Sequence, residues 1–171
     1  MAQAKYISGA QNPRPYPVDS GTDFQVGDLV FSDKADGFAV KPAADFTWNS
    51  TLATTQSDFA LRFAGVVLAT YDGTTFSGAP SAYGLQTGEV MVAQGGVWEM
   101  DCASSSTFYP GTLVGPAKQP GNALESQKVV QTSTEVTSIG RVYQKVVSGD
   151  RVKFEIYPNL AAITTAADTG S

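Results

Sequence analysis

The chain has 171 residues, a formal net charge of −5 and no histidine. This length suits one domain with a sizeable core and argues against two full domains. The acidic balance argues against a nucleic-acid partner, because a phosphate backbone is bound through clustered lysine and arginine. Without histidine a zinc, copper or iron site is not expected, and the single Cys102 excludes an intrachain disulfide. We therefore expect neither a metal nor another cofactor.

Charged residues make up 16% of the chain, below the roughly 25% of ordinary soluble proteins. A weakly charged surface of this kind suits a protein that other subunits cover. No stretch reaches the roughly 18 apolar residues that a membrane helix needs, and the first residues, MAQAKYISGA, lack the apolar core of a signal peptide. We expect a protein made and assembled in the cytoplasm, with no membrane partner.

Residues 1–20 are predicted to form an extended N-terminal arm. Its three prolines, between positions 13 and 17, each remove a backbone donor and push the preceding residue towards extended geometry. A frayed terminus is the alternative interpretation. Large amphipathic rings in an arm often mark a contact surface, and we assign Tyr6, Arg14 and Tyr16 as candidate contact residues.

The β domain is predicted to span residues 21–158 and to begin with a hairpin. Apolar residues 29–31 and 38–40 lie on either side of the turn signal Asp36-Gly37. A short helix is expected after this hairpin.

That helix is predicted because Phe59, Ala60 and Phe63 lie at helical spacing and Ser57 could cap it. Residues 64–70 then indicate a buried strand.

The densest strand signal lies in residues 88–118. Two apolar strands are predicted to meet at Gly95-Gly96, where positive φ would allow a tight hairpin or a bulge. A polar loop over residues 103–110 follows, and its Phe108 and Tyr109 join the candidate contact residues. A Pro-Gly turn then starts the next strand.

The last predicted element is a hairpin of residues 139–147 and 151–157, joined at residues 148–150. Val152, Phe154 and Ile156 alternate with polar residues, so one face of the final strand should be buried. Pro158 ends that strand, because it cannot donate to a sheet ladder. Residues 159–171 form a C-terminal tail with little to bury.

No catalytic motif is found, and we expect no enzymatic activity. Cys102 follows an acid, which favours a buried structural thiol over a nucleophile. Glu99 and Asp101 would share one face of a strand, where paired carboxylates can serve glycoside hydrolysis, but a solvated or interface edge is the favoured interpretation. Trp48 and Trp98 are both assigned to core packing.

A weak internal repeat relates the two halves of the chain. Residues 27–30, GDLV, match residues 111–114, GTLV, and the later residues 63–67 match residues 138–142. One interpretation is that such segments merely start strands after turns. The other is a barrel made from two related halves.

The order of several segments resembles that of the small capsid decoration, or cement, proteins of tailed bacteriophages. The segments are GDLVFSD, FAGVVLA, GEVMVAQGGVWEM, YPGTLVGPA, SIGRVYQKV and RVKFEIYP, which lie between residues 20 and 158. The resemblance implies a mainly β protein: a compact β-barrel or β-tulip domain with one short helix and extended N- and C-terminal arms. It also implies a homotrimer.

The function implied by the resemblance is binding to the major capsid protein on the outer surface of the capsid, after synthesis in the host cytoplasm, so that the shell is stabilised. An alternative from another class is a glycan- or receptor-binding β module of a phage spike or tail. Its site would lie in the loops over residues 77–87 and 103–110, where aromatic rings are compatible with sugar stacking.

Overall fold

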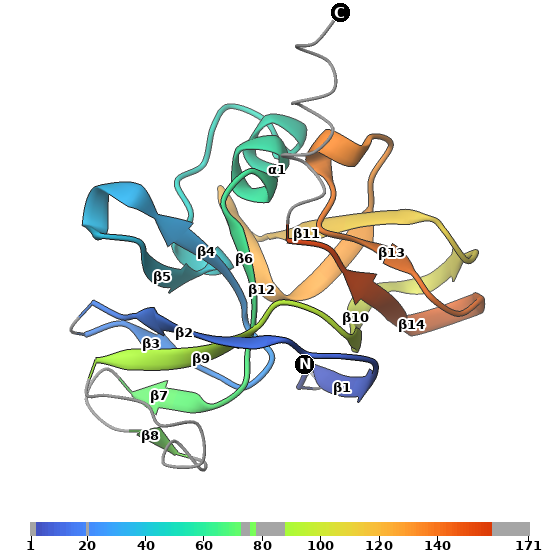
Figure 1. Cartoon of the computed structure of the whole chain (residues 1–171). Coiled ribbons are helices and arrows are strands. Elements are labelled where there is room, and N and C mark those ends of the chain that lie inside the picture. The colour runs from blue at the N-terminus through green and yellow to red at the C-terminus, as the bar shows by residue number, and fades with distance from the viewer. Residues whose placement is uncertain (1–2, 20, 73–75, 78–87, 159–171) are drawn as a thin grey trace, which may run out of the picture.

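Strands make up most of the part of the chain that the computed structural model describes, which is residues 3–19, 21–72, 76–77 and 88–158 (Figure 1). Among these residues lies one α-helix, α1 (Leu52–Ala60). The predicted fold class, mainly β with a barrel and one short helix, is confirmed. The predicted C-terminal tail, residues 159–171, falls outside the described residues. In the described part, no helix is long and apolar enough to cross a membrane.

Five strands in the second half of the chain close into a β-barrel, in the circular order β10, β12, β11, β13, β14 and back to β10. Their bounds are β10 (Val97–Phe108), β11 (Leu113–Gln119), β12 (Ala123–Gln131), β13 (Gly140–Val142) and β14 (Val146–Ile156). β10 and β14 form a long antiparallel pair, with Trp98 opposite Phe154. β10 meets β12 through the parallel pair Asp101 and Lys128, which closes the barrel.

Five strands between residues 13 and 93 form a second sheet, in the order β2, β9, β6, β4, β5. Their bounds are β2 (Pro13–Pro17), β4 (Leu29–Asp33), β5 (Ala39–Pro42), β6 (Phe63–Val67) and β9 (Glu89–Ala93). Val18, directly after β2, forms an isolated parallel bridge with Val40 of β5, so the two edges of this sheet also meet. Short helices of the 3-10 type, Lys34–Asp36 and Ala43–Asp45, follow β4 and β5.

Three short strands form a small separate sheet in the order β3, β7, β8. Their bounds are β3 (Asp23–Phe24), β7 (Thr70–Asp72) and β8 (Phe76–Ser77). β7 and β8 lie in the long connection between β6 and β9, and β3 lies in the segment before β4.

The two halves share one topology. The first unit runs β2, β4, β5, α1, β6, β9, and the second runs β10, β11, β12, the 3-10 helix Glu135–Thr137, β13, β14. When the five strands of each unit are numbered in chain order, their order in the sheet is third, second, fourth, fifth, first in both units. In both units a parallel bridge also joins the first strand, or the residue directly after it, to the third strand. A helical segment follows the third strand in each.

The pairing register shows that the internal sequence repeat is structural. Val30 of β4 lies opposite Gly65 of β6, and Val114 of β11 lies opposite Gly140 of β13. These are the matched positions of the two sequence segments. The interpretation as two related halves is therefore supported by the strand pairing.

Hydrogen bonds at the start of each repeat are equivalent as well. Gly27 N donates to Val67 O at 2.9 Å, and Gly111 N donates to Val142 O at 2.8 Å. Both glycines have positive φ, 94° and 89°, a conformation that side chains rarely adopt. The turn before the second strand is thus built in the same way in both units.

The short helix was predicted, but its cap was wrong. Thr51, in extended conformation, caps α1, and its side chain accepts a hydrogen bond from Thr54 N at 3.2 Å. Ser57 lies inside the helix instead. Phe63 belongs to β6, since the chain leaves the helix after Ala60 and turns into that strand.

The diglycine does not form a hairpin, contrary to prediction. β9 pairs with β2 and β6 of the first unit, whereas β10 belongs to the barrel. Gly95 crosses between the two units, and its N–H donates to Gln11 O at 3.0 Å. A Cβ on Gly95 would lie 2.4 Å from Ala10 O, which explains why a glycine is required. The pattern found both strands but could not show that they belong to different sheets.

One predicted loop is not found. Residues 103–108 continue β10, since Ser106 pairs with Gly149 and Phe108 with Val146 of β14. The final hairpin lies as predicted: Tyr143 N donates to Lys153 O at 2.9 Å, so the pairing continues past β13, and the chain reverses around residues 148–150, where Ser148 has φ of 48°. The predicted hairpin of β4 and β5 and the buried β6 are confirmed.

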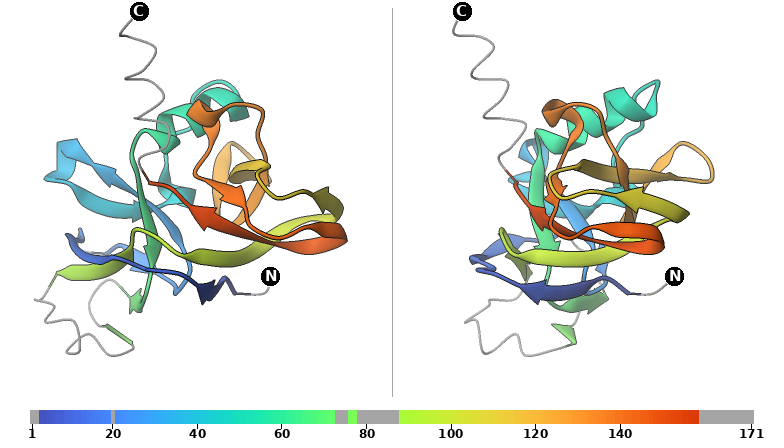
Figure 2. Two further views of the ribbon diagram at one scale, coloured as in Figure 1. Left: turned by 45° about the vertical axis from the view of Figure 1, so that its right-hand side comes forward. Right: turned by 90° about the vertical axis from the view of Figure 1, so that its right-hand side faces the viewer.

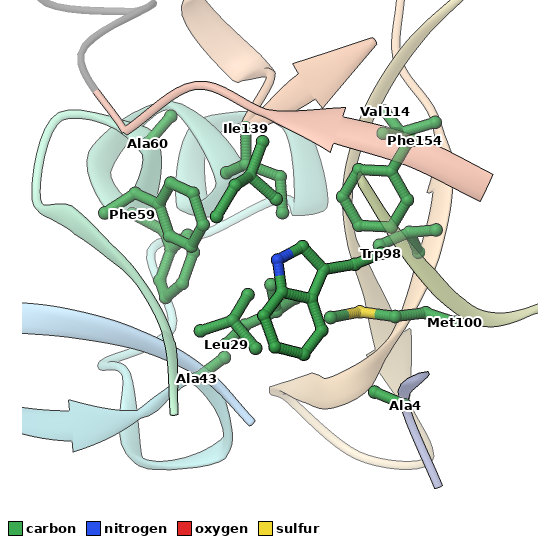
Figure 3. Packing of buried hydrophobic residues seen from close by; sticks show 14 of the residues in the cluster. Ala4, Leu29, Ala43, Phe59, Ala60, Trp98, Met100, Val114, Ile139 and Phe154 are labelled. Atoms are coloured by element: carbon green, nitrogen blue, oxygen red, sulfur yellow. The ribbon is translucent and has the colours of Figure 1, made fainter. Parts of the chain in front are cut away.

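Trp98 lies near the centre of the main core, which draws side chains from both units (Figure 3). Leu29 and Phe59 come from the first unit, and Met100 and Phe154 from the second. All five are at most 1% exposed. A smaller cluster lies within the first sheet and contains Phe24, Val30, Val40, Ala64, Val67, Val90 and Val92. The alternating burial of the final strand is confirmed.

The segment before residue 20 is extended and pairs along its own chain. β1 (Lys5–Ser8) lies beside β10, and β2 lies beside β9, which both views of Figure 2 show as a blue segment along the yellow-green strands. Gln127 of β12 accepts from Ala4 N at 2.8 Å, and Arg151 Nη2 donates to Gln3 O at 3.0 Å. The start of the segment is therefore held against the barrel.

Candidate interaction surface

Three large apolar side chains are exposed at one end of the barrel, which we call the barrel tip: Tyr109, Tyr143 and Val147. They are 58%, 57% and 63% exposed. Tyr109 directly follows β10, Tyr143 directly follows β13, and Val147 is the second residue of β14. Such side chains, grouped on a surface, are typical of a contact site.

Backbone pairing brings these three residues together. Each follows an inward-facing residue: Phe108 and Val142 are 3% exposed, and Val146 packs against the main core. Phe108 lies opposite Val146, and Val142 N donates to Thr112 O at 2.8 Å within the turn that follows Tyr109. Alternation along a strand therefore directs the next side chain outwards at each position.

The tip also carries a positive charge. Lys145 Nζ lies 5.4 Å from the centroid of the Tyr109 ring, a cation–π contact. Tyr109 O accepts from Thr112 N at 3.0 Å, which fixes the turn below the ring. The tip is thus an ordered apolar surface with a lysine beside it.

The five sequence-predicted contact residues do not come together. Tyr6 of β1 packs edge-on against Trp98, with ring centroids 5.6 Å apart, and its hydroxyl donates to Gly9 O at 2.5 Å. Arg14 and Tyr16 lie on β2 of the first sheet, where Tyr16 is half-buried and its hydroxyl accepts from Gln94 Nε2 at 2.8 Å. These three residues pack or pair within their own chain, although Tyr6 remains 38% exposed and Arg14 is exposed as well.

The other two predicted residues differ sharply from each other. Phe108 is buried in the main core, while Tyr109 is exposed at the barrel tip. Sequence reasoning missed Tyr143 and Val147, because both lie in residues 139–147, which were predicted as a strand and not examined for exposed side chains. Tyr143 and Val147 directly follow the inward-facing Val142 and Val146, and this alternation was the signal available in the sequence.

Glu99 and Asp101 form an ion cluster with Arg151. Arg151 Nε donates to Glu99 Oε1 at 3.0 Å, and Arg151 Nη1 donates to Asp101 Oδ1 at 2.6 Å. The two carboxylates do share a strand face, as alternation predicted, and Glu99 lies opposite Lys153 in the register. The single guanidinium pairs with both carboxylates and, through Gln3, ties the N-terminal segment to β14.

Cys102 is buried at 5% exposure, which confirms the prediction of a buried thiol. Burial raises its pKa above the ordinary 9.0, and the nearby Asp150 and Asp101 act in the same direction. Trp48, assigned to the core, is instead half-buried, and Lys118 Nζ lies 4.8 Å from its ring centroid. Among the described residues, no three acids, cysteines or histidines are grouped so that they could hold a metal ion.

The thiol environment gives a direct prediction. Because the thiolate is the reactive form and a raised pKa lowers its population, labelling of native Cys102 by an aromatic disulfide reagent at pH 8 should be at least about tenfold slower than in the unfolded chain. The measurement is the absorbance of released thiolate with and without denaturant. Equal rates in the two states would contradict the buried placement of the thiol.

One of the two loops of the alternative glycan-binding hypothesis is not found as predicted, and the other is not described by the structure. Residues 103–108 are strand, and residues 78–87 lie outside the described residues. The described structure therefore adds no support for that site.

No protein-family model matches the chain, and no curated protein matches it. Among solved structures, the chain is similar to the crystal structure of the head fiber gp8.5 N base in bacteriophage phi29. The identity is 13% and the TM-score is 0.45, with 85% of this chain and 95% of that chain covered. We take no function from a similarity of this size.

Proposed function

We propose that the chain is a non-catalytic structural protein of a tailed-phage virion, which binds the outer surface of the assembled capsid and stabilises it. Its partner is the major capsid protein, and the protein acts as a homotrimer. The order of sequence segments that resembles the decoration proteins supports this proposal. The observation that carries it is the barrel tip, an exposed apolar surface on an ordered barrel.

The barrel tip has the composition of a protein-contact surface. Tyrosine is enriched at interface centres because it buries a large area with few rotatable bonds, and the neighbouring Val147 adds apolar area. The strands that carry the tip are paired, β10 with β14 and β13 with β14. The loss of conformational entropy on binding should therefore be small. In a trimer, three such tips would act together, and modest contacts would then give tight binding.

The test is binding of the purified protein to capsids that lack it, measured by co-sedimentation. A variant with Tyr109→Ser, Tyr143→Ser and Val147→Ser should bind at least about tenfold more weakly, since a single buried aromatic contact is worth about 1–2 kcal/mol or more. All three side chains are exposed, so the fold should be retained, which circular dichroism checks.

Tyr157→Ser is the matched control. Tyr157 is also exposed, but it follows the opposite end of β14 from Val147. Full binding by the triple variant would reject the tip as the capsid-binding surface. Deleting residues 1–20 is not a clean test, because it removes β1 and β2 from two sheets. Sedimentation equilibrium tests the trimer separately, and a monomer at all concentrations would contradict it.

A further inference from the structure

An open groove lies between the first sheet and Pro158, which is two residues beyond the end of β14. Its volume is about 410 Å³, and its lining includes Tyr16 of β2, Phe38 before β5, Leu61 after α1, and Pro158. Phe38 is 57% exposed and Leu61 is 49% exposed. Two large apolar side chains therefore lie in one groove without being covered by the described residues.

Phe38 is held in an unusual backbone conformation. Its φ is 65°, in the left-handed region, where the Cβ of a bulky residue crowds the backbone. Two hydrogen bonds maintain it: Phe38 N donates to Asp33 O at 2.8 Å, and Ser32 Oγ donates to Phe38 O at 3.1 Å. Glycine or asparagine would suit this position better, so a phenylalanine here indicates that the ring contacts a partner.

The chain itself supplies a matching segment. Pro158 lines the groove, so the 13 residues from 159 to 171, NLAAITTAADTGS, continue from its wall. Leu160 and Ile163 are the large apolar residues of this segment. A chain advances at most about 3.3–3.6 Å per residue, so both side chains remain within roughly 20 Å of Pro158. The groove is within their reach.

The charges of the groove and of residues 159–171 are also complementary. Lys34 and Arg62 line the same groove. Residues 159–171 contain one acid, Asp168, and neither lysine nor arginine. Attraction between opposite charges within about a Debye length, roughly 8 Å at physiological salt, favours this segment over a basic one.

We propose that residues 159–171 bind in the groove of their own chain, with Leu160 and Ile163 against Phe38 and Leu61. The proposal does not depend on capsid binding, because the groove adjoins the end of β14 opposite the barrel tip. Binding of this segment covers the exposed side chains of Phe38 and Leu61 and leaves the barrel tip open.

Disulfide trapping in the full chain tests the proposal, with Cys102→Ala in the background. The pair Leu61→Cys and Ile163→Cys should form an intrachain disulfide under mild oxidation at least about tenfold faster than the control pair Tyr143→Cys and Ile163→Cys, because a docked segment has a high effective concentration at one site. Mass and non-reducing electrophoresis distinguish bonds within and between chains. Equal rates for the two pairs, or bonds only between chains, would overturn the proposal.

Hydrogen exchange on the unaltered chain is the second measurement. The amides of residues 160–163 should exchange at least about tenfold more slowly than those of residues 169–171, since docking protects the apolar part of the segment. Phe38→Ser, at an exposed position, should remove that difference while the barrel strands keep their protection. Uniformly fast exchange from residue 159 onwards in the unaltered chain would refute docking.

Discussion

Replacing Gly65 by alanine is expected to lower the free energy of unfolding by about 3–5 kcal/mol. A Cβ at this position would lie 2.0 Å from Ala93 O and 2.9 Å from Val92 Cγ1, both in the neighbouring strand β9. Gly65 also has φ of 140°, which side chains rarely adopt. Because the carbonyl is a backbone atom in a paired strand, relief requires separating β6 from β9. Urea denaturation followed by circular dichroism measures the loss.

Gly121→Ala is the matched control for the conformational part of this cost. Gly121 has φ of 92°, but nothing lies within 4 Å of the position a Cβ would take. Its substitution should cost about 1–2 kcal/mol. A similar loss for the two variants would contradict the steric argument. Gly140, the matched glycine of the second unit, has its nearest obstacle at Glu155 O, 2.2 Å away, so Gly140→Ala should also destabilise by about 1–3 kcal/mol.

The second large effect is expected for Trp98→Ala, with a loss of about 3–5 kcal/mol. Trp98 is 1% exposed, and its Nε1–H donates to Gly95 O at 3.2 Å where the chain crosses between units. Its ring also packs against Tyr6 of β1. The substitution leaves a cavity between the two units and removes one of the contacts that hold β1. The loss is measured as a lower midpoint of urea denaturation, with an unchanged slope of the free energy of unfolding against urea concentration.

Trp48→Ala provides the comparison, because the sequence assigned both tryptophans to the core. Trp48 is half-buried and contacts Lys118, so its loss should cost only about 1–2 kcal/mol. A Trp48 variant as unstable as the Trp98 variant would mean that Trp48 is more buried than the structure shows.

Local patterns predicted the strands well and their partners poorly. Alternation in residues 152–156 and the apolar run of β6 identified buried strands, because burial on one or both faces leaves a direct trace in residue type. The hairpin predicted at Gly95-Gly96 was wrong because a glycine with positive φ can occur in a crossover between sheets as well as in a hairpin turn. The cap of α1 was misplaced because Thr51 and Ser57 are chemically equivalent caps, and only the backbone conformation distinguishes them.

The candidate surface was harder to predict, since exposure depends on register. Tyr109 was identified because it follows a strand, but its neighbour Phe108 turned inwards, as alternation requires. Tyr6 and Tyr16 were assigned to contacts because the prolines near them indicate an extended segment. An extended segment can equally pair with strands of its own chain, and here it does.

The shared topology of the two units also reveals how they have diverged. The connection between fourth and fifth strands is only residues 143–145 in the barrel, whereas in the first unit it occupies residues 68–88 and includes β7 and β8. Barrel closure depends on the strands and not on this connection, so its length is free to change. The two units thus combine one strand topology with one short and one elaborated end, so that a single fold presents two different surfaces to its surroundings.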